Sequence, residues 1–411
     1  MSKCCGQGEP ADINPADPCQ AAMPACCSSA PAPAEAAGPL AHFARMIENC
    51  YEYAAAAKAQ GRPVVGILCE YTPRELILAA GGVPVCLCGG SAATIPAAEE
   101  DLPANLCPLI KSTYGYHVQG SNPFLEMADL VVAETTCDGK KKMYELMAQR
   151  RPMHVLELPQ KPDDAVAFEH WVSELVSLKR RLEALTGREI PDSALRAAIE
   201  LMNRERGLRR RLAELMKADN PPLTGRQLLA LKSSISGQET DLAQYERALA
   251  ELAGQTGPCE RAGRTRVLLT GVPMAHGAER VLDIIESVGG LVVCMESCTG
   301  VKPIMEDVDA GANDLLRAVA AKYFHLPCSV MTPNMGRLEL LERLANEYRP
   351  HCVIDLAWQA CLTYDVESAR VRDFVREELR LPYLRVSTDY SPSDSARIAV
   401  RVEALFETAR P

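Results

Sequence analysis

Short apolar runs alternate with helical patterns in two separate parts of the chain, and this alternation constrains the fold more than any other feature. The first part contains the runs PVVGILC, VPVCLC, ADLVVAETTC and MHVLELP. The second part contains RVLLTG, GLVVCMESC, CSVMTPN, HCVIDLAWQAC and LPYLRVSTD. Apolar runs separated by helices are typical of βα units around a parallel sheet. We therefore predict an α/β fold with two Rossmann-like, doubly wound domains and a helical segment between them.

Changes in composition along the chain set the expected domain boundaries. Residues 1–38 are rich in Ala, Pro, Cys and Ser and lack periodicity, which predicts a disordered tail. We expect an α/β domain over residues 39–160 and another over residues 263–411. Residues 161–262 contain long charged patterns such as WVSELVSLKRRLEAL and no strand-like run, so they are predicted to form helices.

Charge and hydropathy exclude some classes of partner. The 411-residue chain has a net charge of −10, which argues against nucleic acid as its main partner. No window approaches the roughly 18 apolar residues of a membrane span. The start, MSKCCGQGEPADINP, has no apolar stretch typical of a secretory signal. We therefore expect a cytoplasmic protein.

The chain contains 17 cysteines, which is far above the usual number for a cytoplasmic protein. The cytosol keeps thiols reduced, so metal or cluster ligation is favoured over disulfides. The tail has adjacent cysteines that lack the CxxC spacing, and we interpret them as free thiols: Cys4, Cys5, Cys19, Cys26 and Cys27.

Several other cysteines follow predicted strands closely. These are Cys69, Cys137, Cys298 and Cys361. In open α/β sheets, ligands bind beyond the carboxyl ends of the strands, where the loops meet. Cys107 is predicted to lie in a loop before a helix that Pro108 starts, and Cys328 in a short strand. Iron–sulfur clusters need several thiolates from different chain segments, and this arrangement provides them.

The sequence after Cys137, DGKKKMYELM, predicts a helix whose N-terminus adjoins the thiol. Backbone N–H groups and the positive end of the helix dipole would stabilise a negative group there, and Lys140 to Lys142 add positive charge. A solvated basic helix start with an incidental thiol is the alternative. A cysteine hydrolase is disfavoured because none of the seven histidines lies in a partner motif.

Several segments of the chain resemble a known family. They are LCEYTPRELILAAGGVPV, NLCPLIKSTYG, ADLVVAETTCDGKKKMYE, ESCTGVKP, WQACLTYDVES and TDYSPSD. The chain resembles the 2-hydroxyacyl-CoA dehydratase D-component superfamily, which includes benzoyl-CoA reductase subunits and double-cubane cluster proteins. The resemblance covers roughly residues 40 to 408, and it is closest to the double-cubane branch.

The resemblance implies two sets of metal ligands. Dehydratase subunits hold a [4Fe-4S] cluster by three cysteines, which correspond here to Cys107, Cys137 and Cys361. In the double-cubane branch three further cysteines hold a second cubane, and the candidates are Cys69, Cys298 and Cys328. Cys88 or Cys294 could replace a member of this second set. Lys140 and Lys141 are expected beside the cofactor.

The resemblance also implies a reaction. A separate ATP-hydrolysing activator with its own [4Fe-4S] cluster would deliver low-potential electrons, and the chain lacks the GxxxxGK[ST] motif of a nucleotide site. The protein, expected to be a homodimer, would reduce a small-molecule substrate at an [Fe8S9]-type cluster. Side chains that could deliver protons are Glu70, Glu296, Ser297, Thr299 and Tyr364.

Two other functions stay open. The chain could be the [4Fe-4S] subunit of a 2-hydroxyacyl-CoA dehydratase or an acyl-CoA reductase, paired with an unlike chain. It could also be a non-catalytic carrier or scaffold for clusters. The extra cysteines, Cys328 among them, favour the double-cubane reductase.

Overall fold

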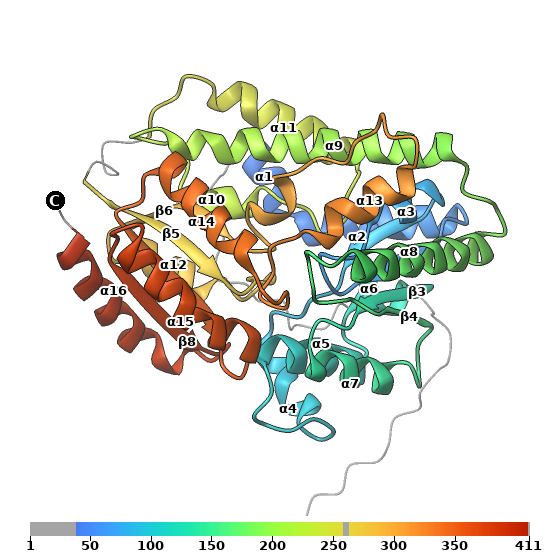
Figure 1. Cartoon of the computed structure of the whole chain (residues 1–411), viewed down its shortest axis with the longest axis horizontal. Coiled ribbons are helices and arrows are strands. Elements are labelled where there is room, and N and C mark those ends of the chain that lie inside the picture. The colour runs from blue at the N-terminus through green and yellow to red at the C-terminus, as the bar shows by residue number, and fades with distance from the viewer. Residues whose placement is uncertain (1–37, 258–262, 410–411) are drawn as a thin grey trace, which may run out of the picture. The chain divides into compact units, whose positions relative to one another are not determined.

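Two parallel four-stranded sheets organise the computed structural model, which describes residues 38–257 and 263–409 (Figure 1). The first sheet has the strand order β2-β1-β3-β4, and its strands are β1 Val64–Ile67, β2 Val83–Cys86, β3 Leu130–Glu134 and β4 Met153–Leu156. The second has the order β6-β5-β7-β8, and its strands are β5 Thr265–Gly271, β6 Gly290–Glu296, β7 Cys352–Trp358 and β8 Tyr383–Thr388. The predicted α/β fold class is confirmed. The tail predicted for residues 1–38 lies outside the described residues, apart from Gly38.

The apolar runs form strands because helices cover the sheets. Every residue of β1, β3, β5, β6 and β7 is buried. Parallel strands buried on both faces are expected to be mostly apolar, and the polar exceptions here include Glu134, Glu296 and Asp355. The edge strands β4 and β8 include exposed positions, among them the apolar Val155 of β4.

The strand order places a topological switch point in each sheet. The chain leaves β1 toward β2 and returns to form β3 on the other side of β1. The second sheet repeats this with β5, β6 and β7. Loops that leave neighbouring strands in opposite directions open a crevice beyond the carboxyl ends, and ligands bind there in this class of fold.

Helices surround both sheets. Those of the first half are α1 Pro39–Ala44, α2 Met46–Ala59, α3 Arg74–Ala79, α4 Ile95–Ala98, α5 Pro108–Gln119, α6 Pro123–Met127 and α7 Asp138–Met147. Those of the second half are α12 Arg280–Ser287, α13 Leu315–Phe324, α14 Met335–Tyr348, α15 Leu362–Glu377 and α16 Ser395–Ala409. Short 3-10 turns are η1 Ala92–Thr94, η2 Leu215–Lys217, η4 Lys302–Ile304 and η5 Pro392–Asp394.

The middle of the chain is helical, as its charged periodic sequence predicts. It contains α8 Ala165–Thr186, α9 Asp192–Glu214, α10 Gly225–Ala230 and α11 Glu239–Leu252. Helix α9, green along the upper side of Figure 1, packs against α3 of the first half and η4 of the second. A loop of this segment also pairs with the first sheet through a bridge between Ile235 and Val85. The segment therefore contacts both α/β halves.

The prediction of a short strand around Cys328 was wrong. The chain after α13 turns at this point, with the N–H of Met331 donating to the carbonyl of Cys328 at 3.0 Å. The run CSVMTPN is apolar, but β5 to β8 already form the second sheet without it. The first four residues of the run, from Cys328 to Met331, are buried in a loop instead, and Cys328 packs in a cluster with residues of the first half.

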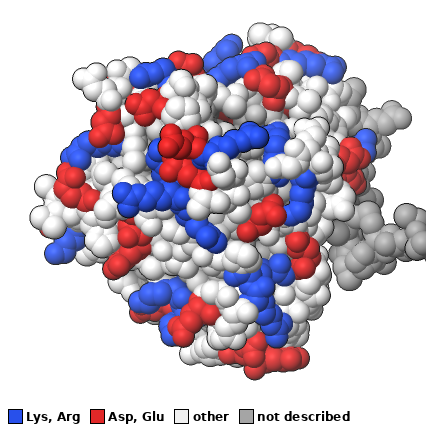
Figure 2. Space-filling model, turned by 90° about the vertical axis from the view of Figure 1, so that its right-hand side faces the viewer, with Lys and Arg blue, Asp and Glu red and all other residues white. Residues whose placement is uncertain are grey.

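Exposed charges of both signs lie side by side on the face of the molecule in Figure 2. Many exposed charges of the described residues form local ion pairs, such as Arg204 with Glu239 and Glu246, both at 2.9 Å. Exposed pairs of this kind contribute about 1 kcal/mol or less to stability. Among the helices of the described residues, none is long and apolar enough to cross a membrane.

Candidate metal centre

Three of the cysteines singled out from the sequence are N-cap residues of helices. Cys107 precedes α5, Cys137 precedes α7 and Cys361 precedes α15, and none of them makes a side-chain capping bond. The helices have 12, 10 and 16 residues. Each therefore presents free N–H groups and the positive end of its dipole at a cysteine.

These three cysteines, which we call the first triad, come together although they are far apart in the sequence. The Cys361 thiol donates a hydrogen bond to the Cys107 sulfur, and this bond is the main reason that the pKa of Cys107 is lowered. The same bond, together with burial, raises the pKa of Cys361. The charge of Cys137 also acts on Cys107. The first triad thus joins two cysteines of the first half to one of the second.

A second group, which we call the second triad, contains Cys69, Cys298 and Cys328. Cys69 lies two residues beyond β1, and Cys298 lies two residues beyond β6. Burial raises the pKa of Cys69 to about 12, and the charge of Cys328 contributes to this shift. Burial also raises the pKa of Cys298 far above its usual value, with contributions from Cys328 and Cys69. This triad joins one cysteine of the first half to two of the second.

Lys140 lies next to members of both triads. Its ammonium group donates to the carbonyl oxygen of Leu68 at 3.1 Å. Burial alone would lower the pKa of Lys140, but the sulfurs of Cys69 and Cys137, among others, raise it well above its usual value. One lysine therefore supplies positive charge to the two groups of thiols.

The neighbouring lysines of the same helix point elsewhere. Lys141 forms an ion pair with Asp138 at 2.9 Å, and about half of its side chain is exposed. Lys142 pairs with Glu145 in solvent. Helical periodicity explains the difference, because successive residues are about 100° apart around the axis.

A second buried lysine, Lys302, lies beside the second triad. Its Nζ is 2.7 Å from Glu296 Oε1, and both side chains are fully buried. The same Nζ is 3.5 Å from the hydroxyl of Tyr364. Burial would lower the pKa of Lys302, but the charge of Glu296 and then that of Cys298 raise it. Arg337, which is also fully buried, pairs with Glu296 at 3.2 Å. The two cations thus share one carboxylate next to the thiols.

The candidate proton donors differ in their surroundings. Burial would raise the pKa of Glu296, but Lys302 and Arg337 outweigh it and keep the pKa low. Glu70 binds the guanidinium of Arg74 through both oxygens, at 2.8 and 2.9 Å.

Tyr364 is the candidate donor that lies against a thiol. Its hydroxyl is 4.0 Å from the sulfur of Cys328, and burial raises its pKa well above the usual value. It therefore keeps its proton at neutral pH. Ser297 and Thr299 form a hydrogen bond with each other at 3.2 Å.

Glu134, at the end of β3, was not among the candidates from the sequence. Burial raises its pKa to about 7, while a hydrogen bond from Thr72 and the charge of Lys140 oppose this. Its Oε2 has no hydrogen-bond partner among the described residues. The motif AETTC contained this residue, but nothing in the sequence showed that it would be fully buried.

Lys302 and Arg337 were missed as well. Lys302 belongs to the motif ESCTGVKP, four residues after Cys298, and η4 turns its side chain back toward the thiols. Arg337 lies in α14, in a stretch with no recognisable motif. Its place depends on how α14 packs against the second sheet, which sequence patterns do not specify.

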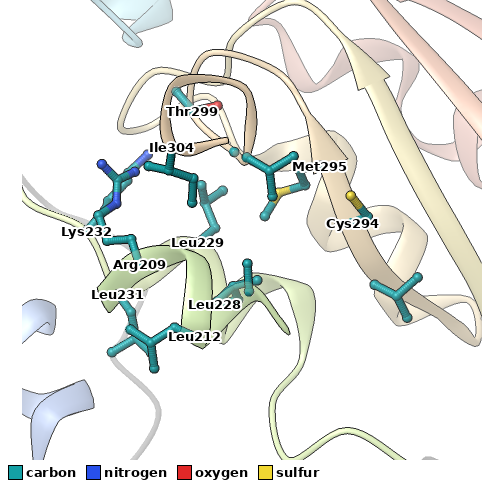
Figure 3. A pocket seen from close by; sticks show the side chains of 14 residues that line it. Arg209, Leu212, Leu228, Leu229, Leu231, Lys232, Cys294, Met295, Thr299 and Ile304 are labelled. Carbon is teal, nitrogen blue, oxygen red and sulfur yellow. The ribbon is translucent and has the colours of Figure 1, made fainter. Parts of the chain in front are cut away.

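Cys294, one of the alternative ligands, lies within β6 at a small cavity whose lining also includes Thr299, the residue after Cys298. The cavity has a volume of about 30 Å³ and is shown in Figure 3, with Leu228 and Leu229 on its α10 side and Cys294 on its β6 side. This volume is about that of one water molecule in the liquid. Burial raises the pKa of Cys294 far above its usual value, and the thiol lies among apolar side chains.

Cys88, the other alternative, lies near the triads. Its sulfur is 3.5 Å from the carbonyl oxygen of Leu68, to which Lys140 also donates. Burial raises the pKa of Cys88 to about 11, and Lys140 opposes this shift. Cys88 therefore stays an alternative to a member of the second triad.

The two triads suit a polynuclear group better than a single ion. In the described ranges, no three His, Cys, Asp or Glu side chains are placed to hold one metal ion. In a cubane each thiolate binds a different iron, so the ligand sulfurs need not converge on one point. Six thiols with buried cations and helix N-termini around them match the needs of a negatively charged cluster.

Comparisons with known proteins identify several chains that are similar to this one. The family model of the 2-hydroxyglutaryl-CoA dehydratase D-component matches residues 69–409. The chain is 41% identical over 354 residues to YjiM of Escherichia coli (strain K12), whose name proposes a role in a dehydratase, and the match spans 85% of this chain and 92% of that one. It is 24% identical to the beta subunit of lactoyl-CoA dehydratase from Anaerotignum propionicum, over 84% and 92% of the two chains. It is 30% identical to a benzoyl-CoA reductase subunit of Thauera aromatica, over 36% and 38%.

Proposed function

Because the chain belongs to the 2-hydroxyglutaryl-CoA dehydratase D-component family, we propose that it is an iron–sulfur reductase. Its two triads would hold two linked cubanes of the [Fe8S9] type. A separate ATP-hydrolysing activator would supply electrons at low potential for the reduction of a small substrate. The observation that carries this proposal is the pairing of two thiol triads, each drawn from both halves of the chain and both next to Lys140.

The ligand set fits a cluster of this kind. Each triad would supply three thiolates to one four-iron cubane. When bound, the cluster would store electrons and pass them to a substrate. The first triad would hold one cubane through Cys107, Cys137 and Cys361, and the second triad would hold the other through Cys69, Cys298 and Cys328.

The surrounding residues have separate tasks in this proposal. Lys140 and Lys302 offset negative charge, and their burial makes this effect stronger than it would be in water. Glu296 holds Lys302 in place, and Arg337 pairs with the same carboxylate. The hydroxyl of Tyr364 would hold a proton near Cys328.

The source of electrons lies outside this chain. The sequence lacks the GxxxxGK[ST] motif, so we assign ATP hydrolysis to the partner. A homodimer of this chain would match a two-fold symmetric activator, because closed two-fold assemblies dock most simply on each other.

A second function is favoured by the names of the relatives. The beta subunit of lactoyl-CoA dehydratase matches most of this chain at 24% identity. A role as one subunit of a 2-hydroxyacyl-CoA dehydratase would use only the first triad and would need an unlike second chain. The second triad would then have no ligand to bind, which is why we place this function second.

The test is a reconstitution under anaerobic conditions. The purified chain, an activator and ATP should together reduce a small unsaturated compound, and omission of ATP or activator should abolish the reaction. The chain alone should not hydrolyse ATP. Dehydration of a 2-hydroxyacyl-CoA that requires a second, unlike chain would instead support the dehydratase. ATP hydrolysis by this chain in isolation would contradict the division of tasks.

A further inference from the structure

A cavity of about 230 Å³ lies between the two halves of the chain, next to the first triad. Its wall includes Leu106 and Pro108, the two neighbours of Cys107, and Gln359 and Ala360, which precede Cys361. It is therefore formed by the loops that carry two of the three thiols. The small cavity at Cys294 is lined by no neighbour of Cys107 or Cys361.

The loop before Cys361 is held in a strained conformation at this cavity. Ala360 has a φ of 60°, in the left-handed region that residues with a Cβ rarely adopt. The N–H of Gln359 donates to the carbonyl of Thr388 at 2.8 Å, and that of Cys361 donates to Trp358 at 2.9 Å. Strained residues fixed in this way concentrate at functional sites.

The charges of the cavity wall disfavour anions. Lys111 is neutralised, because its Nζ binds Glu99 at 2.7 Å and the carbonyl of Ala104 at 2.8 Å. Asp389, which lines the cavity from the second half of the chain, accepts a hydrogen bond from the N–H of Ser391 at 2.8 Å. Two carboxylates and one ammonium group give the wall a formal charge of one negative unit.

Size gives a second restriction. Drug-sized ligands occupy cavities of about 300–1,000 Å³, so this cavity suits a smaller molecule. A coenzyme A thioester carries several phosphate charges and is much larger. We propose that this cavity is the route by which a small uncharged molecule reaches the first triad, an inference that rests on the proposed function.

One pair of variants tests the route in the holoprotein. Ala92 lines the cavity and its neighbour Ala93 does not, while both are exposed in η1. Ala92→Phe should narrow the cavity, and Ala93→Phe is the matched control. The probe is methyl isocyanide, a small neutral ligand for iron, and the readout is the change it causes in the electron paramagnetic resonance spectrum of the reduced protein. Ala92→Phe should raise the concentration for half-maximal change at least tenfold, and Ala93→Phe should leave it unchanged.

A second measurement does not depend on a bound cluster. In the cluster-free full-length chain, neutral iodoacetamide should alkylate Cys107 and Cys361 faster than anionic iodoacetate, beyond the ratio measured for the exposed Cys86. Asp389→Asn should reduce that excess preference severalfold, because it removes the net charge of the wall. Alkylation at each cysteine is followed by mass spectrometry.

The outcomes separate this inference from the proposed function. Equal effects of Ala92→Phe and Ala93→Phe on the half-maximal concentration would overturn the route. Equal alkylation rates for the two reagents, after correction by the ratio at Cys86, would overturn it as well. In either case a bound cluster would still support the reductase. If the purified protein contained no iron, the proposed function would be wrong. The proposed route would then be wrong as well, because it leads to the cluster.

Discussion

Lys140 and Lys302 are the residues that relate the cysteines to a charged cofactor most directly. Each is buried beside thiols that belong to different segments of the chain. A buried ammonium group is costly unless a negative group offsets it. Lys302 has the carboxylate of Glu296, whereas the ammonium group of Lys140 donates to the neutral carbonyl of Leu68. The thiolates of a bound cluster would provide the negative charge that this carbonyl does not.

Lys140→Met should therefore make the cluster harder to reduce. Loss of one positive charge next to the ligands should shift the reduction potential by about 60 mV to more negative values, one factor of ten in the equilibrium constant. Lys141→Met is the matched control, because that side chain pairs with Asp138 in solvent. Anaerobic redox titration measures both. Equal potentials for the two variants would remove Lys140 from the site.

His117 offers a test of the fold that does not involve the metal centre. Burial and the neighbouring Arg151 lower its pKa to about 4, and Arg151 donates to its Nδ1 at 2.8 Å. In the unfolded chain this histidine has a normal pKa of about 6.5. Between pH 6.5 and pH 4 the unfolded chain therefore binds a proton at this residue, and the folded protein does not. The stability that the neutral ring contributes is complete above pH 6.5 and is lost as the pH falls toward 4.

His117→Asn should weaken this pH dependence. The variant keeps an acceptor for Arg151 but cannot take up the proton. Between pH 7 and pH 4.5, we expect the wild type to lose about 2 kcal/mol more unfolding free energy than the variant. Urea denaturation at the two pH values provides the comparison, and parallel losses in both proteins would show that His117 does not titrate as described.

At the scale of elements, the alternating apolar runs predicted both sheets, and their ends predicted where four of the cysteines lie. The run around Cys328 forms a turn instead of a strand, and its apolar pattern does not distinguish a buried turn from a strand. The buried ion pairs of Lys302 and Arg337 with Glu296 could not be predicted, because they join η4, α14 and β6 across the second half. Local patterns thus predicted the elements, whereas the surroundings of the thiols depend on long-range packing.

Helix α5, which Cys107 caps, packs closely against η1 at Gly115. A Cβ added to Gly115 would lie 1.9 Å from the carbonyl oxygen of Thr94, which is far too close. Gly115→Ala should therefore cost about 3 kcal/mol of unfolding free energy. Gly207→Ala in α9, where nothing lies within 4 Å, should instead add about 1 kcal/mol through helix propensity. Denaturation of the two variants tests both signs, and a stabilised Gly115→Ala would contradict the packing of α5 on η1.

At the scale of the whole molecule, two similar α/β halves each contribute three of the six cysteines. Both sheets have the same strand order, and α9 contacts both halves. Each triad takes members from both halves, so a bound cluster would fasten them together. We therefore expect cluster binding to raise the resistance of the chain to denaturation, since a ligand that binds only the folded state stabilises it.

The most direct test of this account is the iron and sulfide content of the anaerobically purified protein. Two cubanes require about eight irons per chain in the wild type. Cys328→Ala should retain about four, because the first triad keeps its ligands, and Cys294→Ala should retain about eight. Four irons in the wild type, with Cys328→Ala indistinguishable from it, would contradict the double-cubane proposal and favour the dehydratase subunit.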